Sequence, residues 1–514
     1  MAWSKYQNQI FEFATNPMNG SFVVNAVAGS GKTTTSVECA KRIVSSNPDL
    51  RVLFLAFNKS IVDTLKEKLV DYPNIRCSTL HALGLSVLGK LKISVNDNKY
   101  KNWFTDKYIR YLDAPLEESK KWPYIYNCVE LLRLCRINLV TARHPEAIVE
   151  IMNRHSIFPV ANEASAVARV LKISSNLMMF RSKNGYEVDY TDMITLPLSE
   201  GFRKMIPKYD VVFIDEAQDL SKAQQELMLE CVRPNVGKFI AVGDPSQSIV
   251  GFAGAMCDSF DILAEKAGKI LPLSVNYRCG RNIVSAAQKY VKEIEAYEDA
   301  TDGEIVRQKS LSDAKPGDMI ICRKTKPLVS VAIKLMSQGK SCFVKGRDIA
   351  ESIIQLIEQA ENTGTLNQIT MTSLYEHLDK EIETLYEKLF NQGIANPQMH
   401  PAMIDLRDKI GACKIIGSHT ENPAEMKALL NKIFDDQIHG DAIMLSTVHK
   451  AKGLEAENVY IICPELLPFR HKNQQLWEIQ QENNLAYVAI TRAKNRLVYV
   501  DVSEDDIESV KICF

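Results

Sequence analysis

The clearest chemistry in the chain lies in one short stretch near its start, Asn25-Ala26-Val27-Ala28-Gly29-Ser30-Gly31-Lys32-Thr33-Thr34. It follows a strand-like apolar run at 21–24 and precedes a helix-like run at 35–44, as a phosphate-binding P-loop does. The backbone N–H groups of such a loop can hold two phosphates, Lys32 can reach the β- and γ-phosphate oxygens, and the Thr33 hydroxyl can bind Mg²⁺. The sequence therefore predicts nucleoside triphosphate binding, although Ala26 stands where the strict pattern has glycine.

Two adjacent acids, Asp215 and Glu216, form the second candidate. They end the apolar run 211–214, which is typical of a buried central strand that brings carboxylates to the edge of a sheet. Beside a P-loop, Asp215 can bind the Mg²⁺ held by Thr33, directly or through water, and Glu216 can deprotonate the attacking water. The alternative is that the two acids cap a helix, but the P-loop would then lack the carboxylates that usually accompany it.

Several predicted strands must position these groups. Apolar runs at 51–57, 75–79, 210–214 and 238–242 predict parallel strands, and open α/β folds bind ligands at the carboxyl ends of such strands. Polar and aromatic residues follow two of these runs, namely Phe57, Asn58, Thr79 and His81. Taken singly, each of them is ordinary loop chemistry.

Two stretches between the predicted strands have helical periodicity. The first, over about 85–200, predicts a helical insertion in the first α/β domain. The second, over about 351–438, carries two apolar stripes. The stripes consist of Leu378, Ile382, Leu385 and Leu389, and of Met426, Leu429, Leu430 and Ile433. We expect them to form the core of that insertion; a docking face for a protein partner is the alternative.

Bulk composition limits the class of protein. The 514 residues are 24% charged and 46% hydrophobic with a net charge of −1, so any contact with nucleic acid must come from a local groove. The 12 cysteines show no metal-binding spacing, which predicts reduced thiols in a cytoplasmic protein without structural zinc or an iron–sulfur cluster. No signal peptide is recognisable, and no apolar stretch approaches the ~18 residues of a membrane span.

Eight motifs together carry a family resemblance. In chain order they read NAVAGSGKTT, LAFNKS, STLHAL, VVFIDEAQD, AVGDPSQSI, SVNYR, STVHKAKGLE and NNLAYVAITRAK. The set resembles the UvrD/Rep/PcrA-like superfamily 1 DNA helicases, including the helicase part of the F-box DNA helicases, from about residue 7 to residue 500. The resemblance implies two RecA-like P-loop motor domains of the α/β class with parallel sheets, each carrying a mainly helical insertion.

The resemblance implies domain boundaries and ATP-site residues. The first motor domain would comprise 1–85 and 195–270 with an insertion at 86–194, and the second 271–350 and 439–514 with an insertion at 351–438. Gln7 would read adenine, Tyr277 would stack on it, and Glu455 would hold the ribose. Gln247 would sense the γ-phosphate. Arg278 and Arg492 would reach the γ-phosphate from the second domain; arginine suits that role because it is a permanently charged fork.

The resemblance also implies a track for single-stranded DNA. Its contacts would be Phe57, Asn58, Thr79, His81, Phe252 and His449. Aromatic stacking tolerates any base, which suits a motor that steps along any sequence. Where many relatives have an aromatic residue, tryptophan and arginine, this chain has Val250, Phe252 and Ala253, so one stacking surface and one phosphate contact differ.

The function implied is an ATP- and Mg²⁺-dependent helicase that moves 3′-to-5′ on single-stranded DNA and acts at junctions with duplex. It would be cytoplasmic, or nucleoid-associated if bacterial or phage-encoded. The alternative is an ATP-gated DNA-binding remodeller or sensor that strips proteins or partners a nuclease and unwinds little. A P-loop kinase would leave Gln247 and Arg492 without a role.

Overall fold

Each of the two units of the chain is built on a parallel β-sheet. The computed structural model describes residues 3–89, 91–112, 114–155, 157, 159–174, 181–182, 185–249, 259–363, 370–391, 396–435, 442–472, 474 and 476–507. The units comprise Met1–Ser274 and Val275–Phe514. The predicted fold class, α/β with a parallel sheet in each of two domains, is confirmed.

The sheet of the first unit has the strand order β3-β2-β7-β8-β1-β9, and all neighbouring strands are parallel. Its strands are β1 (Phe22–Ala26), β2 (Val52–Ala56), β3 (Ile75–Thr79), β7 (Val211–Ile214), β8 (Lys238–Gly243) and β9 (Ile270–Leu273). Because parallel strands are covered on both faces, β2 and β7 are buried along their whole length. The unit therefore extends through β9, beyond residue 270 and up to Ser274.

Helices cover both faces of this sheet. Alternate residues of β2 show the pattern, since Phe54 packs with α1 (Lys5–Thr15), α2 (Lys32–Ser46) and α3 (Lys59–Lys68), whereas Leu53 and Leu55 face the other way. The second face is covered by α4 (Leu80–Leu88), α10 (Lys222–Glu230) and α11 (Ser259–Ala267). The hydrophobic cores on the two faces of the sheet hold its strands in place, and so position the loops that follow them.

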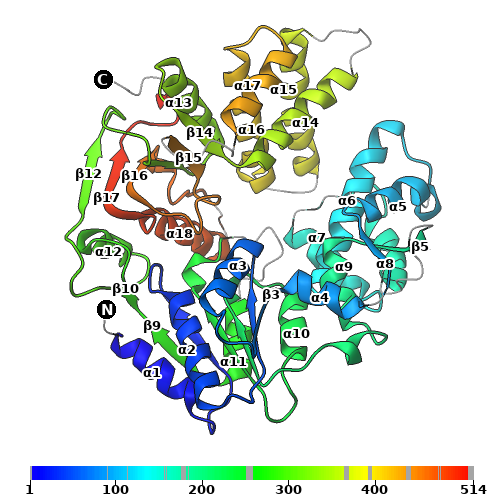
Figure 1. Cartoon of the computed structure of the whole chain (residues 1–514). Coiled ribbons are helices and arrows are strands. Elements are labelled where there is room, and N and C mark those ends of the chain that lie inside the picture. The colour runs from blue at the N-terminus through cyan, green and yellow to red at the C-terminus, as the bar shows by residue number, and fades with distance from the viewer. Residues whose placement is uncertain are drawn as a thin grey trace. The chain divides into compact units, whose positions relative to one another are not determined.

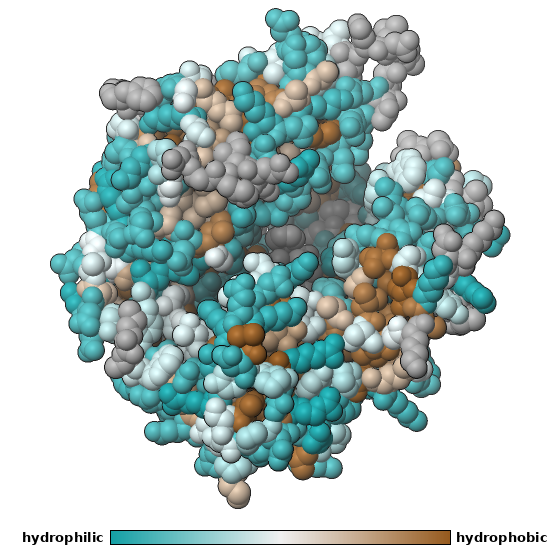
Figure 2. Space-filling view, in the orientation of Figure 1, coloured by the Kyte–Doolittle hydropathy of each residue, from teal (hydrophilic) through white to brown (hydrophobic). Residues whose placement is uncertain are grey.

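The first insertion is mainly helical, as expected, but it also contains a small sheet. Its helices are α5 (Lys99–Lys107), α6 (Glu118–Ile137), α7 (Pro145–Arg154), α8 (Glu163–Ser174) and α9 (Tyr190–Thr195). Its strands are β4 (Ile93–Val95), β5 (Arg181–Ser182) and β6 (Gly185–Val188), in the order β4-β6-β5. Many apolar residues packed on the core of α5–α8 are only partly buried, and hydrophobic surface gathers over the helices of this insertion (Figure 2).

The second unit has a sheet in the order β12-β17-β16-β13-β15-β14, also parallel throughout. Its strands are β12 (Glu304–Gln308), β13 (Met319–Cys322), β14 (Cys342–Lys345), β15 (Ile443–Thr447), β16 (Ala456–Ile462) and β17 (Ala493–Val500). A separate parallel pair is formed by β10 (Val275–Asn276) and β11 (Glu295–Ala296). The accompanying helices are α12 (Arg281–Ala287), α13 (Thr325–Ser337) and α18 (Leu476–Ile490).

The second insertion is a group of four described helices that lie side by side (Figure 1). They are α14 (Arg347–Thr363), α15 (Met371–Asn391), α16 (Pro401–Gly417) and α17 (Pro423–Ile433). Both stripes found in the sequence contribute to the core, because Leu378, Leu389, Met426 and Leu430 are fully buried and Ile382 packs against them. These stripe residues therefore form part of the core of the insertion, and they do not form a docking face.

The described part of the chain shows ten cysteines, all of them free thiols. Within the same residues, no cluster of three or more His, Cys, Asp or Glu side chains is arranged to hold a metal ion. No helix of the described ranges has the length and apolar character needed to cross a lipid bilayer.

Candidate active site

The P-loop joins β1 to α2 with a backbone that only glycine adopts easily. Gly29 and Gly31 have φ values of 65° and 76°, in the left-handed region that L side chains rarely occupy. The Ser30 hydroxyl donates to the carbonyl of Val27 at 2.8 Å and closes the loop. Because no side chain caps α2 at Gly31, the N-terminal turn that begins with Lys32 presents its backbone to a ligand.

A hydrogen bond connects this loop to the acidic end of β7. The Thr33 hydroxyl donates to Asp215 Oδ2 at 2.8 Å, although the two residues are 182 positions apart. Parallel pairing of β1 and β7 with β8 brings their carboxyl ends to one edge of the sheet. A hydroxyl and a carboxylate oxygen are hard ligands of the kind Mg²⁺ prefers, so these two groups fit that ion.

Asp215 is buried and its ionisation is perturbed. Burial, followed by the negative charge of Glu216, raises the pKa of Asp215 to about 6, while Lys32 acts in the opposite direction. The Glu216 amide donates to Asp215 Oδ1 at 3.0 Å, which fixes the carboxylate plane. A bound cation would favour the charged form, so this site is electrostatically prepared for one.

Glu216 is held by Gln218, which is not among the predicted site residues. Gln218 Nε2 donates to Glu216 Oε2 at 2.6 Å, and Gln218 Oε1 accepts the Asp244 amide at 3.0 Å. A Cβ atom on Gly243 would lie 2.5 Å from Gln218 Oε1, so a larger residue there would displace the Gln218 amide. Gln218 thus connects Glu216, the candidate general base, to the end of β8. In the sequence, only its position shortly after the two acids pointed to such a role.

Gln247 lies on the same edge, beyond the end of β8. Its Nε2 donates to Asp244 Oδ2 at 2.7 Å, and both side chains are buried. Burial raises the pKa of Asp244, and the nearby Lys32 lowers it. The structure therefore brings Gln247 close to the P-loop lysine through Asp244, a buried acid that is not among the predicted site residues.

Gln7 packs against the first turn of α2. Its Nε2 donates to Thr35 Oγ1 at 3.1 Å, and its Oε1 accepts the Ser4 amide at 3.0 Å as part of a capping box. A Cβ atom on Gly31 would lie 3.9 Å from Gln7 Nε2. Gln7 is thus adjacent to the phosphate loop, with its amide engaged inside the chain.

Four of the predicted ATP-site residues belong to the second unit. Arg278 Nε forms an ion pair with Glu455 Oε2 at 2.5 Å, and Arg278 Nη1 donates to the Thr491 carbonyl at 3.2 Å. Burial would raise the pKa of Glu455, but Arg278 and Lys494 outweigh it and hold that pKa below its usual value. The ring of Tyr277 lies 5.0 Å from that of Tyr297.

Arg492 is almost completely buried, with 1% of its surface exposed. Its Nε donates to the Val488 carbonyl at 3.0 Å, its Nη1 to the Leu454 carbonyl at 3.0 Å, and its Nη2 to Thr491 Oγ1 at 3.2 Å. The second unit thus places Arg278, Glu455 and Arg492 around one short segment of backbone. In the described structure the guanidinium of Arg492 stabilises that segment.

The candidate DNA contacts of the first unit lie at strand ends. Phe57 is 52% exposed after β2, Asn58 caps α3, and Thr79 caps α4. The His81 ring makes an edge-to-face contact with Tyr190, at 5.9 Å between centroids, and burial lowers the pKa of His81. Tyr190 is 54% exposed and was not predicted, because it lies 109 positions further along the chain, at the start of α9.

His449 and Phe252 are the remaining candidate DNA contacts. Burial, together with Arg323 and Lys450, lowers the pKa of His449 to about 3, so its imidazole is neutral at pH 7. Phe252 lies outside the described residues, as do the departures at Val250 and Ala253.

Comparisons with known proteins agree with this arrangement. A family model described as the UvrD/REP helicase N-terminal domain matches residues 7–267, and one described as the UvrD-like helicase C-terminal domain matches residues 351–504. The first match covers half of the chain and contains the P-loop and both acids.

Individual relatives are distant but extensive. F-box DNA helicase protein 1 of Schizosaccharomyces pombe is 24% identical over 534 residues, covering 96% of this chain and 57% of that protein. F-box DNA helicase 1 of Gallus gallus is 24% identical over 517 residues, covering 92% and 47%. ATP-dependent DNA helicase PcrA of Staphylococcus aureus is 23% identical over 427 residues, covering 60% and 58%. The chain thus spans about half the length of the curated relatives it matches.

Proposed function

The chain belongs to the UvrD-like family of DNA helicases, and from that membership we propose that it hydrolyses ATP to move along single-stranded DNA, 3′-to-5′, and to separate strands at junctions with duplex. The observation that carries the proposal is the hydrogen bond from Thr33 to Asp215. It connects a phosphate-binding loop to an acidic strand end, the combination that phosphoryl transfer needs.

The residues of the first unit supply the hydrolytic chemistry in this proposal. Backbone N–H groups from Ala28 to Thr34 hold the phosphates, and Lys32 places its charge on their oxygens. Thr33 and Asp215 would hold Mg²⁺, which would supply positive charge to the transferred phosphoryl group. Glu216 accepts a proton from the attacking water, and Gln218 keeps that carboxylate oriented through its 2.6 Å hydrogen bond.

The remaining nucleotide contacts follow the same logic. We assign adenine recognition to Gln7 and Tyr277, ribose binding to Glu455, and detection of the γ-phosphate to Gln247. Arg278 and Arg492 would stabilise charge on the γ-phosphoryl oxygens, because arginine donors are fixed, planar and always charged. Their present partners are a carboxylate, a hydroxyl and backbone carbonyls, and phosphate oxygens would have to replace some of them.

For the DNA track we assign stacking on a base to Phe57. Contacts with the sugar–phosphate backbone of the DNA are assigned to four polar residues, Asn58, Thr79, His81 and His449. Phe57 supports this because the residue is about half exposed at a strand end. Both histidines have pKa values below their ordinary value, so they act as neutral donors or acceptors rather than as cations. Tyr190, in contact with His81, extends the aromatic surface. Phe252 completes the assignment from sequence alone.

A second candidate function is a remodeller or sensor that uses the same ATP chemistry and unwinds little duplex. The departures at Val250 and Ala253 favour it, because they remove an aromatic surface and a phosphate contact from a motif that couples ATP to DNA. A protein partner on the second insertion would have to use residues other than Leu378 and Leu430, which are buried.

Steady-state ATP hydrolysis with and without single-stranded DNA tests the proposal. We expect strong stimulation by DNA, and a loss of roughly 10³-fold in Lys32→Ala because phosphate electrostatics are lost. Lys41→Ala, on the same helix but away from the loop, is the matched control and should retain activity. Hydrolysis that ignores DNA would refute the DNA motor even if Lys32 proved essential.

Strand displacement then separates the two candidates. Duplexes with a 3′ or a 5′ single-stranded tail should be opened only from the 3′ tail if the helicase proposal holds. Removal of streptavidin from biotinylated DNA without duplex opening would favour the remodeller.

A further inference from the structure

The outer face of α6 in the first insertion exposes two aromatic side chains. Trp122 and Tyr126, one helical turn apart, are 45% and 49% exposed, and their ring centroids are 6.1 Å apart. The opposite face of the same helix buries Tyr124, Ile125 and Cys128 in the core of the insertion. The exposed pair therefore adds little to that core, and its exposure requires another explanation.

Lysines surround these two rings. Lys101 Nζ of α5 lies 5.9 Å from the centroid of Trp122 and 5.2 Å from that of Tyr126, and Lys121 Nζ lies 5.8 Å from that of Trp122. Glu117, the carboxylate before α6, is paired with Lys120 at 3.1 Å. The face thus combines flat aromatic surface with positive charge, which complements the bases and phosphates of a nucleic acid.

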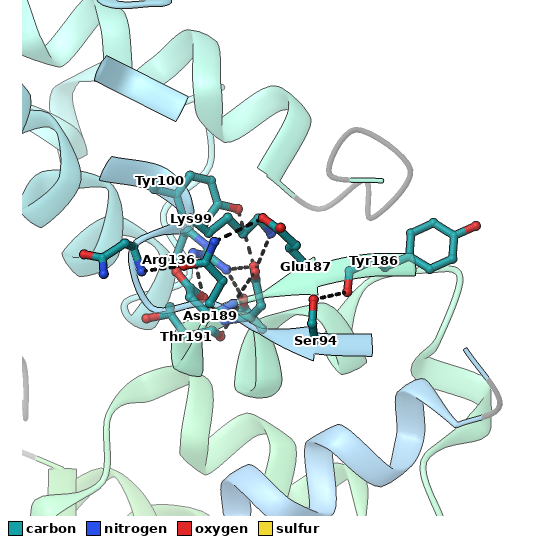
Figure 3. A network of polar contacts seen from close by, with 12 residues as sticks. Ser94, Lys99, Tyr100, Arg136, Tyr186, Glu187, Asp189 and Thr191 are labelled. Carbon is teal, nitrogen blue, oxygen red and sulfur yellow. Dashed lines mark hydrogen bonds and ion pairs between the residues drawn. The ribbon is translucent and has the colours of Figure 1, made fainter. Parts of the chain in front are cut away.

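A buried network anchors the start of α5 and the end of α6 to the residues at the start of α9 (Figure 3). Lys99 Nζ, at the start of α5, pairs with Asp192 Oδ2 at 2.5 Å, and Arg136, near the end of α6, pairs with Asp192 and with Asp189. The Arg136 guanidinium also lies 4.7 Å from the ring centroid of Tyr100. Lys101 follows Lys99 and Tyr100 on α5, so the network anchors the start of the helix that carries this lysine.

We propose that this face, formed by Trp122, Tyr126 and Lys101, is a second binding site for unpaired nucleotides, separate from the predicted track at the ends of β2 and β3. Unpaired rather than duplex nucleic acid is the occupant because a ring can stack only on a base whose face is open. The inference rests on the proposed function and adds a contact to it: a strand held here stays associated while the track releases it.

Binding of fluorescein-labelled oligothymidylates to the full chain, measured by anisotropy, tests the proposal. One probe of about 40 nucleotides is long enough for both sites, and one of about 8 nucleotides fills a single site. The variant is Trp122→Ala/Tyr126→Ala, and Lys101→Gln is a second variant that leaves both rings in place. Trp477→Ala is the matched control, because Trp477 is also 45% exposed.

For the double variant we expect affinity for the long probe to fall about fivefold or more, with maximal ATPase stimulation unchanged within about twofold. Lys101→Gln should weaken binding less and reduce its salt dependence. If the double variant bound the long probe as tightly as Trp477→Ala does, the inference would be overturned while the proposed function would stand. The same holds if the double variant lost as much affinity for blunt duplex as for the long single-stranded probe, since stacking on open bases would not explain that loss. If the unaltered chain neither binds nor responds to DNA, the proposed function fails and the inference with it.

Discussion

Replacing Asp215 by asparagine should stabilise the first unit while strongly reducing ATP hydrolysis. Burial and Glu216 raise the pKa of Asp215 from its ordinary value of 3.8 to about 6. The folded state therefore holds a proton that the unfolded chain releases between about pH 4 and pH 6, and the stability contributed by this group falls as pH rises through that window. A difference of about two pKa units corresponds to about 3 kcal/mol, fully expressed above pH 7.

Asparagine removes this penalty because it cannot ionise, and it keeps both hydrogen bonds. Its oxygen can accept the Glu216 amide, and its NH₂ group can donate to the Thr33 hydroxyl, which accepts as readily as it donates. We expect Asp215→Asn to match the unaltered protein near pH 4 and to exceed its free energy of unfolding by about 2–3 kcal/mol at pH 7–8. ATP hydrolysis should fall by at least about 10²-fold because the Mg²⁺ ligand is lost.

The assay is urea unfolding at several pH values in the presence of EDTA and without nucleotide. Hydrogen exchange of amides in β1 and β7 reports on the first unit specifically. Asp210→Asn is the matched control, because Asp210 precedes the same strand but pairs with Arg233 at 2.5 Å and accepts the Arg51 amide at 2.9 Å, so its loss should destabilise. Destabilisation by Asp215→Asn at pH 8, or a gain that does not change with pH, would refute the electrostatic reasoning.

Two other substitutions probe the interior of the first insertion and its packing on α4. Lys99→Met should lower the free energy of unfolding by about 3 kcal/mol, because Asp192 loses a buried partner, and Lys99→Met/Asp192→Asn should recover part of the loss in thermal denaturation. Gly84→Ala should destabilise by about 3 kcal/mol or more, since its Cβ would lie 1.8 Å from the Met193 carbonyl oxygen. Gly201→Ala, with no neighbouring atom within 4 Å, should change stability by less than about 0.5 kcal/mol in the same measurement. Equal effects of the two glycine substitutions would contradict the close packing of α4 on α9.

The sequence predicted the strands and the loop because their signals are local. Buried parallel strands read as continuous apolar runs, and the P-loop has its own residue pattern. An exposed edge strand such as β12 carries no such run and gives no comparable signal. The small sheet of the first insertion was missed because its strands have two to four residues. Such short segments acquire their conformation from their neighbours.

Contacts between distant residues were the harder part of the site to predict. Gln218 and Asp244, 26 positions apart, became recognisable only when adjacent strands placed them together. Lys99 and Arg136 look like surface residues in the sequence, yet their side chains are 2% and 4% exposed. Burial of a charged residue can be inferred from a sequence only if its partner is known. Here the partners Arg136 and Asp192 are more than 50 positions apart.

Arg492 shows how such contacts change the interpretation of an activity measurement. Its guanidinium donates to the carbonyls of Val488 and Leu454, so Arg492→Ala leaves buried acceptors unpaired and should destabilise the second unit. Loss of hydrolysis in that variant would therefore not identify a phosphate contact. Arg492→Lys keeps the charge, and hydrogen exchange in β16 and β17 reports whether the fold is retained. A fall in kcat with unchanged exchange and KM would support the γ-phosphate role, whereas a fall that follows faster exchange would make Arg492 a structural residue and leave Arg278 as the arginine to test.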